Sequence, residues 1–148
     1  FKTLENNTRL NWQESPEQRL STLRNFRLAN QGKSLKQCIQ ATLDFYSLLP
    51  IGSMSLDPYD KTTWLTLWQI IHSNDYCEFN KALIYAYTLH YLGFPSNIQV
   101  GKTKDNHHMI CVVDNYVLNI EYNRIVELDW LKNNKWHCEE IHDTNQLC

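Results

Sequence analysis

The sequence predicts an α+β domain in which helices come first and a small antiparallel sheet follows. Through its first half, the 148-residue chain shows helix-type spacing of apolar residues, with caps and proline stops. After Pro95, short runs rich in β-branched and aromatic residues take over, separated by turn signals. Helices segregated from strands along the chain are typical of the α+β class.

Composition narrows the function classes. Hydrophobic residues make up 43% of the chain, which indicates a globular protein, and we expect one domain over 1–148. The formal charge is −2 with no basic stripe, which argues against nucleic-acid binding. No apolar run is long enough to span a membrane. We expect the protein to be a monomer. The five cysteines form no CxxC pair, so they give no zinc-ribbon pattern.

Three helices are expected in the part of the chain before Cys77. Ser15 is a plausible N-cap for a helix over 15–30, with proline at its first helical position. A second helix begins at Ser34 and is stopped by Pro50. A third, short helix covers 62–73, with one of its first two threonines as the cap.

A fourth helix is predicted from "NDYCEFNKALIYAYTLHYLG", which places Cys77 at its start and Gly93 at its end. A thiol at a helix N-terminus faces the positive end of the dipole and several unpaired N–H groups, and both stabilise the thiolate. The same N–H groups can stabilise an oxyanion. The position therefore suggests a nucleophile, although a buried cysteine can equally well only fill space.

The second half predicts a meander of short strands. "SNIQVGKT", "HHMICVV", "YVLNIEY" and "RIVELDW" are β-rich runs, and "KWHCEEIHD" can add another strand. Asp114-Asn115 is a two-residue hairpin signal that would pair Val113 with Tyr116. The helix that begins at Cys77 would pack its apolar face on this sheet.

The hairpin register suggests a base for the thiol. Side chains alternate along a strand, so His108, Ile110 and Asn119 would share one face while His107 projects from the other. We expect the shared face to be the one that meets the Cys77 helix. His108 would then act as the base, and Asn119 would orient its ring, as in a Cys-His-Asn arrangement.

These residues resemble the bacterial transglutaminase-like cysteine proteinases. "DYCEFNKALIYAYTLHYLGFPSNIQVG", "HHMICVV" and "YVLNI" are similar to that family's cysteine helix, "HMVL"-type strand and "VLDN" strand. Upstream, "ATLDFYSLLPIGSMSLDPYDKTTWLTLWQII" is similar to the helix, turn and Trp-bearing helix before the cysteine. The resemblance extends over about 35–125 and implies a papain-like core, a thiol protease (hydrolase) activity and a periplasmic or secreted bacterial protein.

Carried over by position, the resemblance implies Cys77 as nucleophile, His108 as base and Asn119 in the place usually held by Asp. The resemblance also implies that three residues lie near the substrate and the oxyanion: Trp64, and the two neighbours of the cysteine, Tyr76 and Glu78. Trp64 can equally well be a core residue. Asn can fix the imidazole tautomer but does not offset imidazolium charge. Restoring Asp at 119 is therefore expected to maintain or raise activity.

The family's calcium site is expected to be degenerate. Characterised members bind calcium through acidic residues that flank the cysteine, whereas here Tyr76 and Phe79 occupy the flanking positions beside Glu78. Calcium needs several oxygen ligands, so we expect no calcium and no other cofactor.

Three other functions remain open at this stage. A degenerate domain of the same fold would bind a peptide or protein without cutting it. A metal site could use Cys77, His107, His108, His137 and His142, although "HCEEIH" lacks HExxH spacing. Transglutamination or deamidation would use the same thiolate and base as proteolysis. In each catalytic case the partner is a protein or peptide substrate. A periplasmic location is favoured by the family resemblance, and the start at Phe1 is consistent with a removed signal peptide.

Overall fold

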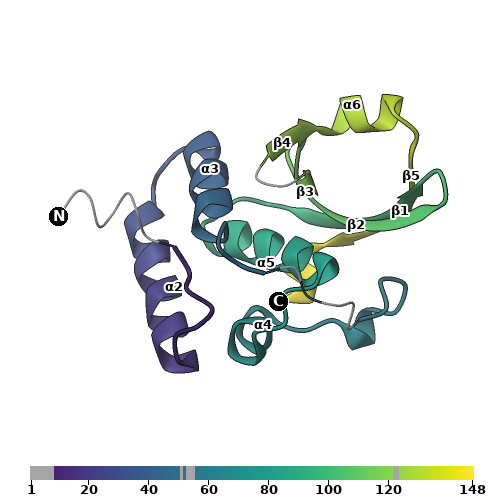
Figure 1. Ribbon diagram of the computed structural model, residues 1–148. Helices are drawn as coiled ribbons and strands as arrows, with labels where there is room; N and C mark the ends of the chain where they lie inside the picture. The colour runs from purple at the N-terminus through teal and green to yellow at the C-terminus, as the bar shows by residue number, and fades with distance from the viewer. Residues whose placement is uncertain (1–8, 51, 53–55, 122–123) are drawn as a thin grey trace.

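The computed structural model describes residues 9–50, 52, 56–121 and 124–148. Helices precede strands, as predicted, and the α+β class is confirmed (Figure 1). The helical part comprises α2 (Pro16–Asn30), α3 (Leu35–Phe45), the 3-10 helix η1 (Lys61–Thr63), α4 (Leu67–Ser73) and α5 (Glu78–Tyr91). The remaining elements are β1 (Asn97–Thr103), β2 (Asn106–Val113), β3 (Tyr116–Glu121), β4 (Arg124–Glu127), α6 (Leu128–Asn133), β5 (Trp136–Asp143) and α7 (Thr144–Leu147).

The strands form one antiparallel sheet in the order β4-β3-β2-β1-β5. Val113 pairs with Tyr116, which confirms the two-residue hairpin at Asp114-Asn115. Asp114 has a φ of 54°, in the left-handed region that short hairpin loops need and that Asp tolerates. Sequential strands therefore pair in a meander, and only β5 returns to the far edge beside β1.

Side-chain caps explain where most of the helices begin. Ser15, Ser34 and Thr66 each accept a hydrogen bond from the third helical residue, a glutamine whose side chain bonds back to the cap. This reciprocal capping box satisfies two backbone donors at the helix start. The predicted starts of α2 and α3 are confirmed, whereas the cap of α4 is Thr66 and not Thr62 or Thr63.

Two predicted boundaries also need correction. Helix α3 ends at Phe45, before the proline stop at Pro50. The run "RIVELDW" is a strand only to Glu127, after which α6 begins. The backbone amide of Leu128 donates to the carbonyl of Asn115 in the hairpin loop between β2 and β3. At this residue the chain leaves the sheet and α6 begins.

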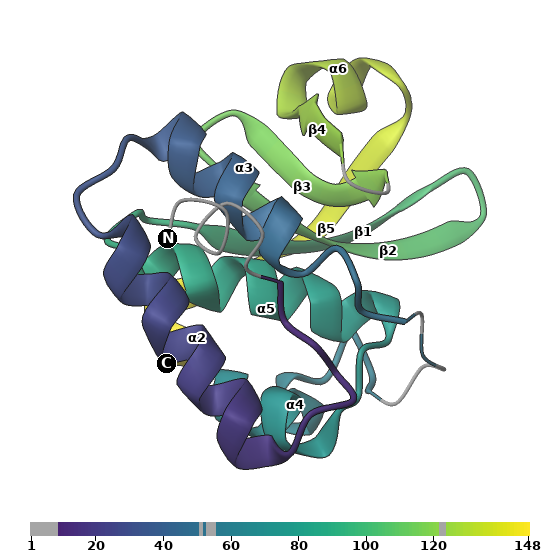
Figure 2. The same cartoon turned by 60° about the vertical axis from the view of Figure 1, so that its left-hand side comes forward.

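Helix α5 lies between the sheet and helices α2 and α4 (Figures 1 and 2). Figures 1 and 2 show the sheet on one side of α5 and helices α2 and α4 on the other, while α6 covers the opposite face of the sheet. Ten of its fourteen residues are buried, which fits a helix enclosed on nearly all sides. The prediction that the Cys77 helix packs on the sheet is confirmed.

A buried arginine joins α2 to the end of α4. The Arg19 guanidinium donates from Nε to the Ile71 carbonyl at 2.9 Å and from Nη2 to the His72 carbonyl at 3.0 Å. Its Nη1 donates to the carbonyls of Trp12, at 3.2 Å, and Glu14. The last carbonyls of a helix have no intrahelical partner, so this one side chain satisfies acceptors that α4 leaves open.

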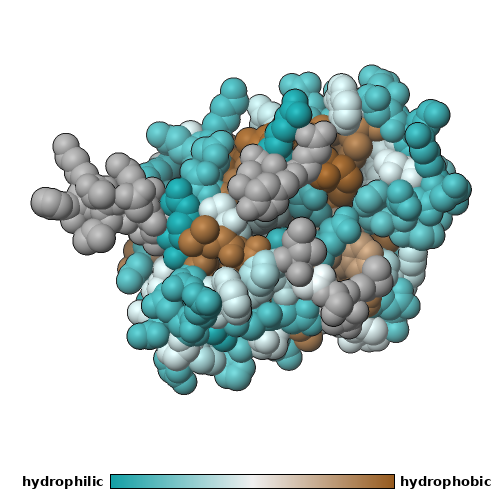
Figure 3. Space-filling model, viewed as in Figure 1, coloured by the Kyte–Doolittle hydropathy of each residue, from teal (hydrophilic) through white to brown (hydrophobic). Residues whose placement is uncertain are grey.

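The face of the molecule seen in Figure 3 is mostly hydrophilic, with hydrophobic residues in separate patches. Among the described residues, no helix has the length and apolar character needed to cross a membrane.

We predict that Arg19→Ala lowers the free energy of unfolding by about 3 kcal/mol, because it leaves one buried and three partly buried carbonyls without this donor. Arg19→Lys should recover only part of this loss, since an ammonium cannot reach several separate carbonyls at once. Urea unfolding measures the change. The exposed Arg24 on the same helix provides the control, and an Arg24→Ala loss as large as that of Arg19→Ala would contradict the prediction.

Candidate active site

Cys77 is the N-cap of α5. Its backbone is extended, with φ −61° and ψ 164°, and its Sγ accepts a hydrogen bond from the Asn80 amide at 3.4 Å. The residue is only 1% exposed. The sulfur therefore stands at the positive end of a fourteen-residue helix, an environment that stabilises negative charge on it.

The turn before Cys77 is fixed by residues that the sequence reasoning did not single out. The Asn80 side chain donates to the Asp75 carbonyl at 2.9 Å, and the Gly52 amide donates to the Tyr76 carbonyl at 3.2 Å. A Cβ at Gly52 would lie 3.2 Å from the Cys77 nitrogen, so glycine lets the two backbones approach closely. Asn80 occupies the third helical position, where a cap partner is expected; Gly52 carries no local signal.

His108 contacts the first residue of α5. Its Nδ1 lies 3.2 Å from Oε1 of Glu78, which directly follows Cys77 in the chain. The neighbouring histidine is turned elsewhere: Nδ1 of His107 lies 2.8 Å from the hydroxyl of Tyr59. Of the two histidines, His108 is the one held at the start of the Cys77 helix.

The face of β2 that lies under α5 is not the one predicted. Met109, Cys111 and Val113 belong to the core that includes α5, whereas Ile110 and Val112 pack with α6. Sequence alternation placed His108 and Ile110 together and facing the helix. The alternation itself holds, but Ile110 and Val112 face α6. His108 reaches α5 through the carboxylate of Glu78.

Asn119 makes its hydrogen bonds to the backbone of β2. Its Oδ1 accepts from the Cys111 amide and its Nδ2 donates to the Met109 carbonyl, both at 2.7 Å. Among the described residues, this amide thus bonds to the main chain and not to the His108 ring as predicted. A side-chain amide carries one acceptor and a donor group, so it can replace a neighbouring peptide in the ladder between β2 and β3.

The two predicted aromatic neighbours are packing residues in this structure. Trp64 donates from Nε1 to the Asp57 carbonyl at 2.9 Å, and its ring stands edge-on to His142 with centroids 5.0 Å apart. Tyr76 is 1% exposed, and burial raises its pKa to about 12 despite the opposing effect of Arg19. Their role in substrate binding stays a prediction.

The chain has four thiols besides Cys77. Burial is the main cause that raises the pKa of Cys38, Cys111, Cys138 and Cys148. Since the thiolate is the reactive form, these four are poor nucleophiles below neutral pH. They therefore act as internal references for any reaction at Cys77.

The described residues do not bring the proposed metal ligands together. His107 contacts Tyr59, and Nε2 of His142 lies 2.9 Å from Oε1 of Glu140. Within the described ranges, no group of three or more His, Cys, Asp or Glu side chains is arranged to hold a metal ion. Next to the cysteine, Tyr76 and Phe79 are buried rings, so they offer calcium no carboxylate.

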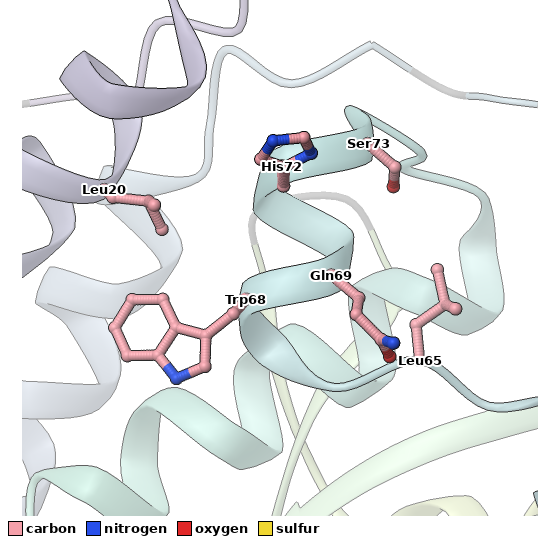
Figure 4. A pocket seen from close by; sticks show the side chains of 6 residues that line it. All are labelled: Leu20, Leu65, Trp68, Gln69, His72 and Ser73. Atoms are coloured by element: carbon pink, nitrogen blue, oxygen red, sulfur yellow. The ribbon is translucent and has the colours of Figure 1, made fainter.

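A cavity of about 450 Å³ lies between α2 and α4 (Figure 4). Leu20 from α2 and Trp68 from α4 face one another across it, and His72 stands at its upper end. Its lining includes none of the residues at the start of α5. The cavity is therefore not a part of the cysteine site as the structure presents it.

Solved structures supply the comparison. The sequence matches no protein-family model and no curated protein. Legionella pneumophila LapG, a bacterial transglutaminase-like cysteine protease, superposes with a TM-score of 0.70 at 14% identity, over 88% of this chain and 81% of LapG. The chain shares the LapG fold. Calcium-bound LapG superposes equally well, with a TM-score of 0.70 over 97% of this chain and 86% of that one, again at 14% identity.

The contacts of Asn119 change the outcome expected for Asn119→Asp. A carboxylate keeps the acceptor for Cys111 but loses the donor to Met109, and it places negative charge against a carbonyl. We predict a loss of about 1–3 kcal/mol in the free energy of unfolding at neutral pH. The loss should shrink near about pH 4, where the protonated acid can donate again.

The exposed Asn25 on α2 is the matched control, since Asn25→Asp makes the same change in charge. Denaturant unfolding at both pH values is the measurement. Equal losses in the two variants would show that the bonds to the β2 backbone do not matter.

Proposed function

We propose that the chain is a cysteine-dependent peptidase or amidase of the transglutaminase-like type. The observation that supports this most is the position of Cys77: its sulfur caps the helix that packs on the sheet, and His108 contacts the next residue along. The fold shared with LapG, a transglutaminase-like cysteine protease, adds support. We propose a protein or peptide substrate and a periplasmic location.

In the proposed reaction the Cys77 thiol passes its proton to His108, and the thiolate attacks an amide carbonyl. A C–S bond forms, and backbone N–H groups at the start of α5 stabilise the oxyanion. The imidazolium then protonates the departing amine as the C–N bond breaks, leaving a thioester. Water attacks the thioester with His108 as base, and this releases the acid and restores the thiol. An amine in place of water would give transglutamination.

Cys77→Ala and His108→Ala are each expected to lower turnover on the order of a thousandfold or more, because nucleophile and base act as one unit. Cleavage of a peptide library, read by mass spectrometry, measures this. His107→Ala is the matched control: it removes the adjacent ring, which contacts Tyr59, and should leave turnover nearly unchanged.

If the wild-type protein cleaves no peptide or amide, and His108→Ala leaves alkylation of Cys77 unchanged, a binding function takes the place of catalysis. The amide of Asn119 bonds to the β2 backbone and not to the His108 ring, and this favours the second candidate, in which the same fold binds a peptide without cutting it.

We predict that calcium leaves the melting temperature of the protein unchanged, because the rings at 76 and 79 offer no carboxylate and Glu78 contacts His108. Thermal unfolding with calcium and with a chelator measures this. A rise that the chelator reverses and that Glu78→Gln abolishes would show that a calcium site exists beside Cys77.

A further inference from the structure

We propose that Glu78 is the residue that positions His108, in place of Asn119; this rests on the proposed function. The carboxylate Oε1 and the ring Nδ1 are 3.2 Å apart, within hydrogen-bond distance. The side chain of His108 is 22% exposed and that of Glu78 is 54% exposed, so the ring is the more enclosed partner. Thirty residues separate the two in sequence, so the tertiary fold creates the contact.

The contact determines which ring nitrogen can act as the base. With Nδ1–H donating to the carboxylate, the neutral ring carries its lone pair on Nε2, the nitrogen that can take a proton from the thiol. The carboxylate also balances the charge of the imidazolium that forms, which the neutral amide of Asn119 cannot do. Glu78 thus supplies both parts of the role that an Asp or Asn fills in other triads.

Asn119 is committed elsewhere. Both ends of its amide bond to the β2 backbone at 2.7 Å, on either side of Ile110. Turning this amide toward the imidazole would leave the Met109 carbonyl and the Cys111 amide without those partners. Its contribution is to the path of the strand that carries His108, and the orienting contact comes from α5.

The helix start makes Glu78 suited to this position. As the first residue of α5, its carboxylate lies near the positive end of the dipole, where an acidic side chain is stabilised. It is also one peptide away from the nucleophile, so the base is tied to the same helix turn that carries the sulfur. A small shift of α5 against the sheet would therefore move Cys77 and the orienting group together.

Glu78 has two opposite electrostatic effects on the thiol, and they can be separated. Through His108 it favours the thiolate–imidazolium pair and speeds alkylation. As a bare negative charge beside the sulfur it would disfavour the thiolate and slow alkylation. Removing the carboxylate therefore slows the reaction if the first effect dominates and accelerates it if the second does.

The test is the rate at which iodoacetamide alkylates Cys77 at about pH 6, mapped by mass spectrometry in chelator-treated buffer, where the other thiols react poorly. His108→Ala is expected to slow it roughly a hundredfold, and Glu78→Ala roughly tenfold. Glu78→Gln keeps an acceptor for Nδ1–H without the charge, so its alkylation rate should lie between those of wild type and Glu78→Ala.

A double-mutant cycle separates positioning from a purely structural role. In the His108→Ala background, Glu78→Ala should no longer slow alkylation, because the carboxylate acts through the ring. Glu140→Ala is the matched control, since it removes a carboxylate that lies 2.9 Å from the similarly exposed ring of His142. In this variant the alkylation rate of Cys77 should stay within about twofold of the wild-type rate.

Each result bears on a different statement. If Glu78→Ala accelerates alkylation, or slows it equally with and without His108, the positioning role is wrong while the catalytic site stands. If His108→Ala has no effect, the proposed function fails first. Slowing by Glu78→Ala that depends on His108, with Glu140→Ala unaffected, supports the proposal.

Discussion

The buried guanidinium of Arg19 determines where the chain can turn toward the cysteine. It bonds to the carbonyls of Ile71 and His72 in the last turn of α4, and to carbonyls of the segment before α2. Asn74 then adopts a left-handed conformation, with φ 62°, and ends the helix. Because the end of α4 is anchored, the few residues that follow bring Cys77 to one defined place at the start of α5.

At that place, helix capping and the proposed chemistry involve the same backbone groups. The first amides of α5 have no intrahelical acceptor, and the Cys77 sulfur satisfies one of them. A thiolate is in general a better acceptor than a thiol, and the capping contact would also be available to a thiolate. Asn80 contributes twice: its backbone amide donates to the sulfur, and its side chain donates to the Asp75 carbonyl in the preceding turn.

The sheet carries His108, the proposed base, and its pairing is irregular on the way to that residue. The backbone pairing between β2 and β3 is regular at Val112–Val117 and Val113–Tyr116, and farther along Asn119 bridges the strands with its side chain. His108 lies beyond that bridge, at the end of β2 that comes to the start of α5. The strand is thus held by an amide while the ring is held by a carboxylate from the helix.

Local signals were sufficient for α2, α3, α5 and the hairpin and for the position of the thiol, but not for the start of α4 or for α6. Capping residues, the Asp114-Asn115 turn and apolar spacing act within a few residues, so the sequence by itself determined the helices before the sheet, the hairpin and Cys77 at a helix start. Strand alternation also identified which residues share a face, but a period of two does not say which face is covered. That choice depends on where α5 packs. The Glu78–His108 contact and the Arg19 bonds to α4 join residues 30 to 53 positions apart. Only the tertiary structure could decide them, because no short-range rule relates residues that distant in the chain.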